Sequence, residues 1–444
     1  MRILHVNTHA QGGGAARLAS DLANATREAG HSVLMAVRAN GAGSCGTKII
    51  EHSVYRHFWA RFSNRLLRNL PSGNRLARCL GRPWNSLKVL LGHEDFDFPA
   101  SWHVLKLPSA RPDILHLHNL HGAYFDLRAL PWLSQQIPTV LTLHDAWMLS
   151  GHCCHGFDCE RWRTGCGHCP DLTIYPAIRR DATAYNWRRK QRIYSQSRLH
   201  VVTPSQWLMN KARDSMLAPS MVSARVIPHG IDLSVFRPAD RGQARTDLGL
   251  PPEAPILLFA AKGIRSNVWK DYQTMRQAFD ILSRRCGKKK LLFIALGEEA
   301  PSERIGDSEL RFIGHSNDWL VVAKYYQAAD LYVHGAKAEA WGLTITEAMA
   351  CGLPVVASDV GGIPDQVTNG QSGFLIPVGD ADRMADRIGR LLEDNAERKE
   401  MGQRACQRAH AEFGLSRMTD NYLDFYETIL AQKHPIEVPL SQGH

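Results

Sequence analysis

Two carboxylates in residues 339–358 have a spacing that suits the binding of a ligand rich in hydroxyls. Glu339 lies in AKAEAWG, a loop after the expected strand DLYVHG, and Glu347 lies in the apolar run GLTITEAMACG, which predicts a helix beginning near residues 342–344. Free N–H groups at the start of that helix favour an anion such as a diphosphate, whereas carboxylates accept hydrogen bonds from hydroxyls on either side of it. A nucleoside-diphosphate sugar has this layout. An exposed helix acid and an unrelated loop charge explain the spacing at least as well.

Three cations follow the first strand expected in the second half of the chain, within KGIRSNVWKD. A diphosphate leaving group gains negative charge as the glycosidic bond breaks, so a donor site of this kind needs cations. We favour Lys270 and Arg265 for this role, with Lys262 as a third candidate. A solvated basic loop is the competing interpretation.

Three glycines, Gly12, Gly13 and Gly14, open the first expected helix. Glycine lets a backbone approach another molecule closely, and a helix start favours phosphate, although a plain tight turn is equally consistent with glycines. His144 ends the strand PTVLTLHD, where an imidazole could hydrogen-bond a sugar hydroxyl or help the phosphate leave. A lone histidine is more often structural.

Five of the ten cysteines fall between residues 153 and 169. Cys153, Cys159, Cys166 and Cys169 are spaced by five, six and two residues, and the last two have the gap of the usual chelating half of a zinc site. We predict a structural zinc that pins a long loop. Free thiols that only pack, disulfides or another metal are the alternatives. Spare ligand candidates are Cys154, His152, His155 and His168.

These residues must be positioned by alternating strands and helices. The chain opens with a strand–turn–helix–strand unit of the kind that begins a doubly wound sheet. Its parts are the strand RILHVN, the Gly-rich turn, an amphipathic helix ending at Gly30 and the strand HSVLMAVRA. Further strands are expected in DILHLHN, PTVLTLHD, LHVVTP and ARVIPHG. The turn-rich stretch 227–238 resembles a domain joint, after which the alternation restarts with APILLFAA.

The predicted organisation is therefore α/β, with two doubly wound Rossmann-like domains. Residues 1–228 form the first, with a basic helical insertion at about 45–110 and the Cys-rich loop 151–170, and residues 229–415 form the second. The family resemblance described below implies that the two face a cleft, with the acceptor side in the first domain and the donor in the second. Residues 416–444, the end of a helical stretch from about 394, would cross back to the first domain. A chain of 444 residues suits two domains of this size.

The composition is that of a soluble protein with a formal net charge of +10. The N-terminus lacks the apolar core and cleavage site of a signal peptide, and no apolar run is long enough to cross a membrane, so we expect a cytoplasmic protein. Residues 55–84 carry many arginines and no acid, with an apolar stripe at helical spacing. This segment either lies on an anionic membrane or packs on its own domain with its arginines in solvent.

The run from Glu339 to Val356 resembles the E-x7-E signature of retaining glycosyltransferases of family 4, which have the GT-B fold. The resemblance continues through VLTLHDAW, VVTPSQWL, VIPHGIDLSVFRP, ASDVGGIPDQV and NGQSGFLIPVGD, so it covers most of the chain. It implies that Glu339 contacts the donor sugar, that Glu347 contacts the ribose, and that backbone N–H groups of Trp341, Gly342, Leu343 and Thr344 face sugar and phosphates. It also implies site roles for His144 and for the glycine loop. The family places a basic pair near Lys270, commonly Lys followed by Gly; here Asp271 follows, which leaves the upstream partner open.

The resemblance implies a hexosyltransferase that moves a sugar from a nucleoside-diphosphate sugar to a glycan or polyprenyl-linked acceptor, with retention and without a catalytic metal. The run TLHDAW…GCGHCP is similar to bacterial exopolysaccharide enzymes of the colanic-acid type, which implies surface-polysaccharide synthesis and peripheral contact with the inner membrane. No nucleic-acid signature occurs. The alternatives are a sugar-nucleotide epimerase on the same fold and a non-catalytic, zinc-stapled adaptor for membranes or nucleic acid.

Overall fold

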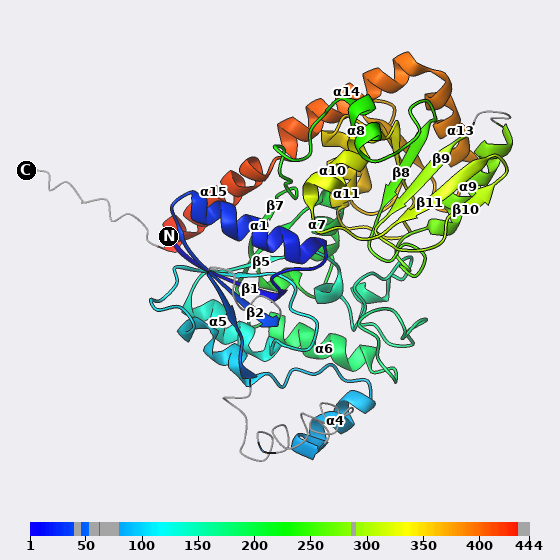
Figure 1. Ribbon diagram of the computed structural model, residues 1–444. Helices are drawn as coiled ribbons and strands as arrows, with labels where there is room; N and C mark the ends of the chain where they lie inside the picture. The colour runs from blue at the N-terminus through cyan, green and yellow to red at the C-terminus, as the bar shows by residue number, and fades with distance from the viewer. Residues whose placement is uncertain (40–45, 53–61, 63–79, 286–289, 434–444) are drawn as a thin grey trace, which may run out of the picture. The chain divides into compact units, whose positions relative to one another are not determined.

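The computed structural model describes residues 1–39, 46–52, 62, 80–285 and 290–433. They form two compact units, whose elements are drawn in Figure 1. Unit 1 comprises residues 1–203, 211–227 and those from Met418 onward, and unit 2 comprises residues 204–210 and 228–417.

Unit 1 is built on a parallel seven-stranded sheet of order β3-β2-β1-β4-β5-β6-β7. The strands are β1 (Arg2–His9), β2 (Ser32–Ala39), β3 (Thr47–Ile49), β4 (Ile114–Leu117), β5 (Thr139–Thr142), β6 (Leu199–Thr203) and β7 (Met221–Val226). Every residue of β4, β5 and β6 is buried, as expected where helices and connections cover both faces of a parallel sheet. The strand order changes direction between β1 and β4, so the loops that leave these two strands flank the switch point of the sheet.

Helices and one late segment complete unit 1. The helices are α1 (Gly14–Glu28), α4 (Pro83–Leu90), α5 (Leu130–Gln136), α6 (Thr183–Tyr194), the end of α7 (Gln206–Arg213) and α15 (Leu415–Lys433) from Met418. Tyr426 Oη lies 2.7 Å from His116 Nδ1 and Tyr422 Oη lies 3.0 Å from Thr142 Oγ1, so α15 is bonded to both β4 and β5.

Unit 2 has a second seven-stranded sheet of order β10-β11-β9-β8-β12-β13-β14, parallel except for the β10–β11 pair. Its strands are β8 (Ile256–Ala260), β9 (Leu292–Leu296), β10 (Glu303–Ile305), β11 (Ser308–Ile313), β12 (Leu331–His334), β13 (Val355–Ser358) and β14 (Gly373–Ile376). Successive side chains of β8 point to opposite faces. Leu258 therefore joins one apolar core and Phe259 joins the other.

Helices cover each face of this sheet. They are α8 (Arg241–Asp247), α9 (Tyr272–Arg285), α10 (Trp319–Ala328), α11 (Leu343–Ala350), α12 (Ile363–Gln366), α13 (Ala381–Glu393) and α14 (Asn395–Glu412). Side chains of α9 and α13 fill one core, whereas α10, α11 and α14 fill the other. The sheet of unit 2, and with it the carboxyl ends of its strands, is therefore held by an apolar core on each face.

The structure differs from the sequence expectations at several points. Residues 204–210 belong to unit 2, because the amide of Gln206 donates to Asp365 Oδ2 at 2.7 Å. The helical stretch expected from about 394 to 432 is two helices, α14 and α15, with a break where Ile231 hydrogen-bonds both Phe413 and Leu415. Strands β3 and β10 were not predicted.

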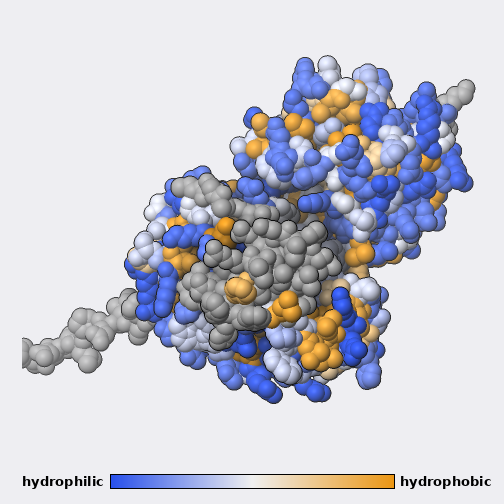
Figure 2. All heavy atoms as spheres, turned by 60° about the horizontal axis from the view of Figure 1, so that its bottom comes forward, coloured by the Kyte–Doolittle hydropathy of each residue, from blue (hydrophilic) through white to orange (hydrophobic). Residues whose placement is uncertain are grey.

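The basic segment 55–84 lies mostly outside the described residues, which include only Phe62 and those from Leu80 onward. Its described end is α4, where apolar side chains face solvent: Trp84 is 78% exposed and Leu90 is 47% exposed. Figure 2 shows hydrophobic residues gathered on the face turned forward from the bottom of Figure 1, where α4 lies. Among the described helices, none is both long and apolar enough to span a membrane.

Candidate functional site

The candidate site of unit 2 lies where the strand order of its sheet changes direction. Strand β8 pairs with β9 on one side and with β12 on the other, so loops leave adjacent carboxyl ends at the switch point. Backbone bonds tie these loops together, because the Asp271 amide donates to the Gly335 carbonyl at 3.0 Å and the Lys337 amide donates to the Trp269 carbonyl at 2.8 Å. The chain is thereby fixed on both sides of Lys270.

The structure brings Lys270 and Glu339 into direct contact. Lys270 Nζ donates a hydrogen bond to Glu339 Oε2, and the two side chains are only 14% and 16% exposed. The same Nζ lies 3.1 Å from His334 Nε2, and Tyr332 Oη lies 3.3 Å from His334 Nδ1. An ammonium group can only donate, so His334 Nε2 accepts and the ring proton sits on Nδ1. The result is a polar cluster of Lys270, Glu339 and His334.

The charges of this cluster are set by burial and by its cation. Burial raises the pKa of Glu339, but the neighbouring Lys270 charge outweighs burial and holds that pKa well below its usual range. Burial and the Lys270 charge lower the pKa of His334 to about 4. Near neutral pH, Glu339 is therefore an ionised acceptor for hydroxyl groups and not a general acid.

The start of α11 corrects the expectation for Gly342. Its amide donates to Gln366 Oε1 at 3.0 Å, and Gln366 Nε2 donates back to the Gly342 carbonyl at 2.9 Å. The Gly342 N–H is thus not open to a phosphate. Leu343 and Thr344 form the first turn of α11, where amides have no acceptor within the helix. The Trp341 side chain packs edge-on against Phe413 in the core.

Glu347 is buried in the second turn of α11. It is 2% exposed, and its Oε2 accepts a hydrogen bond from Tyr326 Oη at 2.8 Å. The alternative interpretation, a solvent-exposed helix acid, is therefore wrong. A buried carboxylate needs polar partners, and the Tyr326 hydroxyl is one of them.

A glycine turn supports the backbone of Glu339. The Gly362 amide donates to the Glu339 carbonyl at 2.9 Å. Gly361 has a φ of +62°, and a Cβ there would lie 1.9 Å from that carbonyl oxygen. Only glycine fits this close approach, so the turn DVGG determines where the loop of Glu339 lies.

The other two predicted cations are placed less closely. The Arg265 amide and Nε donate to Glu298 at 2.8 and 2.6 Å, so this guanidinium is already paired. Arg265 and Lys270 nevertheless line one cavity of 670 Å³, together with Arg276. Lys262 is exposed. The structure thus groups Arg265 with Lys270 and leaves Lys262 on the surface.

Unit 1 carries the predicted glycine loop at its own switch point. Gly12 and Gly13 have φ values of 90° and 83°, and Gly13 is the N-cap of α1, which begins at Gly14. A Cβ at Gly12 or Gly13 would meet no described atom within 4 Å. The backbone here is open to a ligand.

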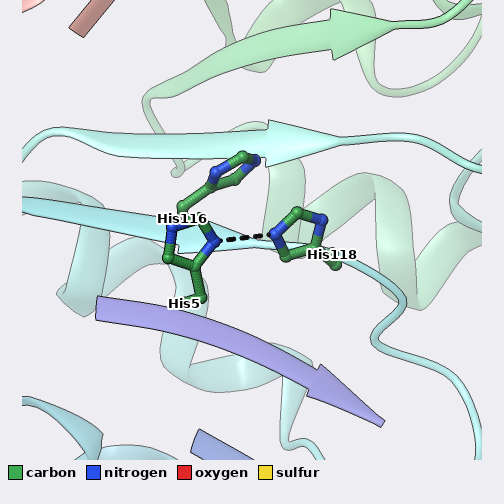
Figure 3. Close-up of side chains that lie close together, drawn as sticks. All are labelled: His5, His116 and His118. Atoms are coloured by element: carbon green, nitrogen blue, oxygen red, sulfur yellow. Dashed lines mark hydrogen bonds between the residues drawn. The ribbon is translucent and has the colours of Figure 1, made fainter. Parts of the chain in front are cut away.

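His144 belongs to a buried chain of imidazoles. Its Nε2 lies 3.1 Å from His118 Nδ1, and His118 Nε2 lies 3.0 Å from His5 Nδ1. Figure 3 shows the His5–His118 bond, with His116 beside it on β4. Burial lowers the pKa of His144 to about 4 and that of His5 to about 3. These rings are therefore neutral near pH 7, and His144 can donate through one nitrogen and accept through the other.

Asp145 is held beside the histidine chain. Its Oδ2 lies 2.9 Å from His121 Nε2, and its Oδ1 accepts from the Trp147 amide at 2.8 Å. Burial raises its pKa, but His121 outweighs burial and holds the pKa well below its usual range. Asp145 thus anchors the turn that leads from β5 into the cysteine-rich loop.

The four predicted cysteines line one small cavity in that loop. Burial raises the pKa of Cys166 to about 12, so a free thiol here is protonated and a poor nucleophile.

Several residues of the site were missed from the sequence. His334 ends the strand before Glu339, and His116 and His118 stand two apart in DILHLHN, a spacing that places both on one face of a strand. That alternation could have revealed the imidazole chain. Gln366 gave no signal, since its partner Gly342 is 24 residues away.

Two glycosyltransferase family models match the chain. The model "Glycosyltransferase Family 4" matches residues 12–235, and "Glycosyl transferases group 1" matches residues 240–408. A D-inositol 3-phosphate glycosyltransferase of Catenulispora acidiphila is 35% identical over 214 residues, which are 45% of this chain and 50% of that protein. The chain spans about half the length of the curated relatives it matches.

Two solved structures share the fold over nearly the whole chain. Sucrose-phosphate synthase from Thermosynechococcus elongatus has a TM-score of 0.64 at 19% identity and covers 97% of this chain and 99% of its own. Anabaena HepE, solved with UDP and glucose, has a TM-score of 0.63 at 16% identity and covers 96% of this chain and 100% of its own. The predicted class, two Rossmann-like α/β domains of the GT-B type, is confirmed.

Proposed function

The chain belongs to Glycosyltransferase Family 4, and on this premise we propose that it transfers a sugar from a nucleoside-diphosphate donor to a hydroxyl of its acceptor, with retention of configuration. The observation that carries the proposal is the contact of Lys270 with Glu339 and His334 at the switch point of unit 2. A fixed ammonium beside an ionised acceptor, next to the start of α11, matches a ligand that joins hydroxyls to a diphosphate.

The donor would be bound along the edge of the sheet. Glu339 accepts hydrogen bonds from sugar hydroxyls. Glu347 accepts hydrogen bonds from ribose hydroxyls, while its Oε2 also accepts from Tyr326 Oη. The amides of Leu343 and Thr344 face the diphosphate, which the positive end of α11 favours. Lys270 neutralises the same group.

The transfer step needs no nucleophile from the protein. The bond between the anomeric carbon and the phosphate oxygen breaks while the acceptor oxygen bonds that carbon on the same face. The acceptor proton passes to the departing phosphate oxygen. Lys270 and the start of α11 stabilise the charge that develops on the diphosphate, so we propose no metal for the chemical step.

We assign acceptor and sugar recognition in unit 1 to His144 and to the amides of Gly13 and Gly14. The neutral His144 ring can hydrogen-bond a sugar hydroxyl without adding charge. The open glycine backbone suits a phosphate of the donor or of the acceptor.

The relatives suggest which substrates to test first. UDP-sugars lead the donor panel, because HepE was solved with UDP-glucose. For the acceptor we propose a glycan or polyprenyl-linked glycan of bacterial surface polysaccharide, and inositol phosphate is the comparison, since the curated relatives are named for it. Transfer to inositol phosphate alone would contradict the surface-polysaccharide role.

We propose a peripheral contact with an anionic membrane, on the cytoplasmic face, through α4 and the segment before it. No Asp or Glu occurs between Glu51 and Glu94, whereas residues 55–84 contain seven arginines. The exposed Trp84 and Leu90 would enter the headgroup region while the cations meet acidic lipids.

Liposome sedimentation tests the membrane contact. Trp84→Ala should reduce sedimentation with phosphatidylglycerol vesicles, whereas Trp319→Ala, a change at a partly exposed tryptophan of unit 2, should not. Equal sedimentation of the wild type with neutral and acidic vesicles, or no effect of Trp84→Ala, would contradict the role.

Calorimetry with UDP, GDP and ADP tests the donor site. A hydrogen bond to a charged group contributes about 1.5–3 kcal/mol, so Glu347→Gln should weaken nucleotide binding roughly 10- to 100-fold. Glu393→Gln, at an exposed glutamate of α13, is the matched control. If none of the three nucleotides binds, the proposed transferase function is wrong, and if Glu347→Gln binds like the wild type, the ribose role is wrong.

A further inference from the structure

Residues 151–170 form a cysteine-rich loop between β5 and α6 of unit 1. Its four predicted ligands lie up to 16 positions apart in sequence, yet all line one small cavity. They are Cys153, Cys159, Cys166 and Cys169. Four cysteines thus line one cavity in a loop that has no strand and no α-helix of its own.

The backbone at one end of this loop is strained around Cys166, and both Cys166 and Cys169 line the cavity. Residues 165–168 all have positive φ, including Cys166 at 53° and His168 at 47°. A left-handed conformation costs a non-glycine residue about 1–2 kcal/mol and persists only where the surroundings require it. The turn is held from outside, since the Gly167 amide donates to Thr183 Oγ1 at 2.9 Å and the Cys169 amide donates to Asp181 Oδ2 at 2.7 Å.

We propose that Cys153, Cys159, Cys166 and Cys169 bind a structural zinc ion. A gap of two residues between Cys166 and Cys169 suits chelation of one ion, and four thiolates favour zinc in tetrahedral geometry. Zinc–sulfur bonds of about 2.3 Å require the sulfurs to approach to about 3.8 Å. The four sulfurs are not among the described groups whose ligand atoms all lie within 4.8 Å of one another, so zinc binding at this site requires the cysteine side chains to rotate toward one another.

The surroundings can accommodate the charge of this site. Zinc with four thiolates carries two negative charges, and Arg161 and Lys211 line the same cavity. The Gly151 amide donates to Cys166 Sγ at 3.3 Å, a bond that supports a thiolate ligand.

Two other groups of metal-binding residue types lie closer together but have other partners. His5, His116 and His118 place ring nitrogens within 4.8 Å of one another, but Tyr426 and Thr142 occupy both nitrogens of His116. In the second group, His121 and Asp145 are paired with each other. The contacts of His116, His121 and Asp145 already occupy atoms that an ion would need, so we favour the cysteine loop as the metal site.

The zinc would fix the segment that follows His144 and Asp145. The Ala146 amide donates to the Cys154 carbonyl at 2.7 Å, so the residue next to Cys153 is bonded to the chain leaving β5. The metal site does not depend on the proposed transfer reaction, and its loss would loosen this connection without touching unit 2.

Metal analysis of the full-length protein, purified without added metal and after zinc reconstitution, tests the proposal. We expect about one zinc per chain. Cys166→Ser and Cys169→Ser should retain roughly tenfold less zinc. Cys154→Ser, at the neighbouring buried cysteine that is not assigned as a ligand, should retain it.

A second measurement covers the case in which a variant fails to fold. Cobalt added to the metal-free wild type should give the visible absorption of tetrahedral cobalt and the near-ultraviolet bands of sulfur ligation. Absence of these bands, absence of stoichiometric zinc after reconstitution, or an intact mass showing disulfides among the four residues would overturn the proposal. Nucleotide binding in the same preparation separates this outcome from failure of the transferase proposal.

Discussion

Replacing Lys270 by methionine removes the ammonium of the site while keeping most of its apolar stem. Glu339, whose side chain is 16% exposed, would then lie beside a neutral His334 at 3.5 Å. Removing one partner of a buried pair costs about 3–5 kcal/mol, whereas removing both charges is often nearly neutral. Because the pair is not fully buried, we expect Lys270→Met to destabilise unit 2 by about 3 kcal/mol and Lys270→Met/Glu339→Gln by about 1 kcal/mol.

The pH dependence of this variant has a definite sign. Burial is the largest influence on the pKa of Glu339 and raises it, while Lys270 and His334 lower it. Without Lys270 the pKa of Glu339 rises, so the folded variant binds the proton more tightly than the folded wild type does. Lys270→Met should therefore gain stability relative to the wild type as the pH falls from 7 to 5. The pKa of His334 rises as well, because one cause of its lowering is gone, and this acts in the same direction.

Hydrogen exchange read by mass spectrometry measures the effect locally. Peptides covering residues 256–271 and 331–350 report the two loops and the strands that carry them. Arg276→Met, which breaks an exposed pair with Glu303, is the matched control and should cost less than about 1 kcal/mol. The reasoning fails if Lys270→Met exchanges like the wild type, or if the double variant is less stable than the single one.

Three further outcomes are expected. In chemical denaturation, Gly361→Ala should destabilise unit 2 by at least about 2 kcal/mol more than Gly370→Ala. Both glycines have positive φ, but only at Gly361 would a Cβ lie 1.9 Å from a backbone oxygen, so equal costs of the two variants would refute the clash. Unit 1 should lose about 3 kcal/mol of stability from His144 alone as the pH falls from 6.5 to 4, because the pKa of His144 is about 4 in the folded state and 6.5 in the unfolded chain, which therefore binds the proton at higher pH. Denaturation midpoints that do not change over this range would contradict the prediction. Tyr426→Phe should cost about 1–2 kcal/mol by leaving His116 Nδ1 without its partner, and unchanged exchange protection of β4 would argue against this.

The pairing of Lys270 with Glu339 could be expected from the sequence, because both follow buried strands whose carboxyl ends share one edge. Apolar runs such as ILLFA predict those strands directly. The burial of Glu347 could not be predicted, since it depends on Tyr326 in another helix.

The same limit applies to Gly342. Amides at a helix start usually have no acceptor within the helix, and only the fold shows that the Gly342 amide donates to Gln366 Oε1. Local patterns thus predict a candidate loop, and contacts between distant segments decide which groups in that loop are available.

The return of α15 to unit 1 has a consequence for biosynthesis. Tyr422 and Tyr426 supply the phenols that bond Thr142 and His116, yet they leave the ribosome after all of residues 228–417. Unit 2 can therefore finish folding while the nascent unit 1 still exposes the strands that these phenols will meet. A truncated product ending near residue 227 would carry the same exposed surface permanently and should aggregate.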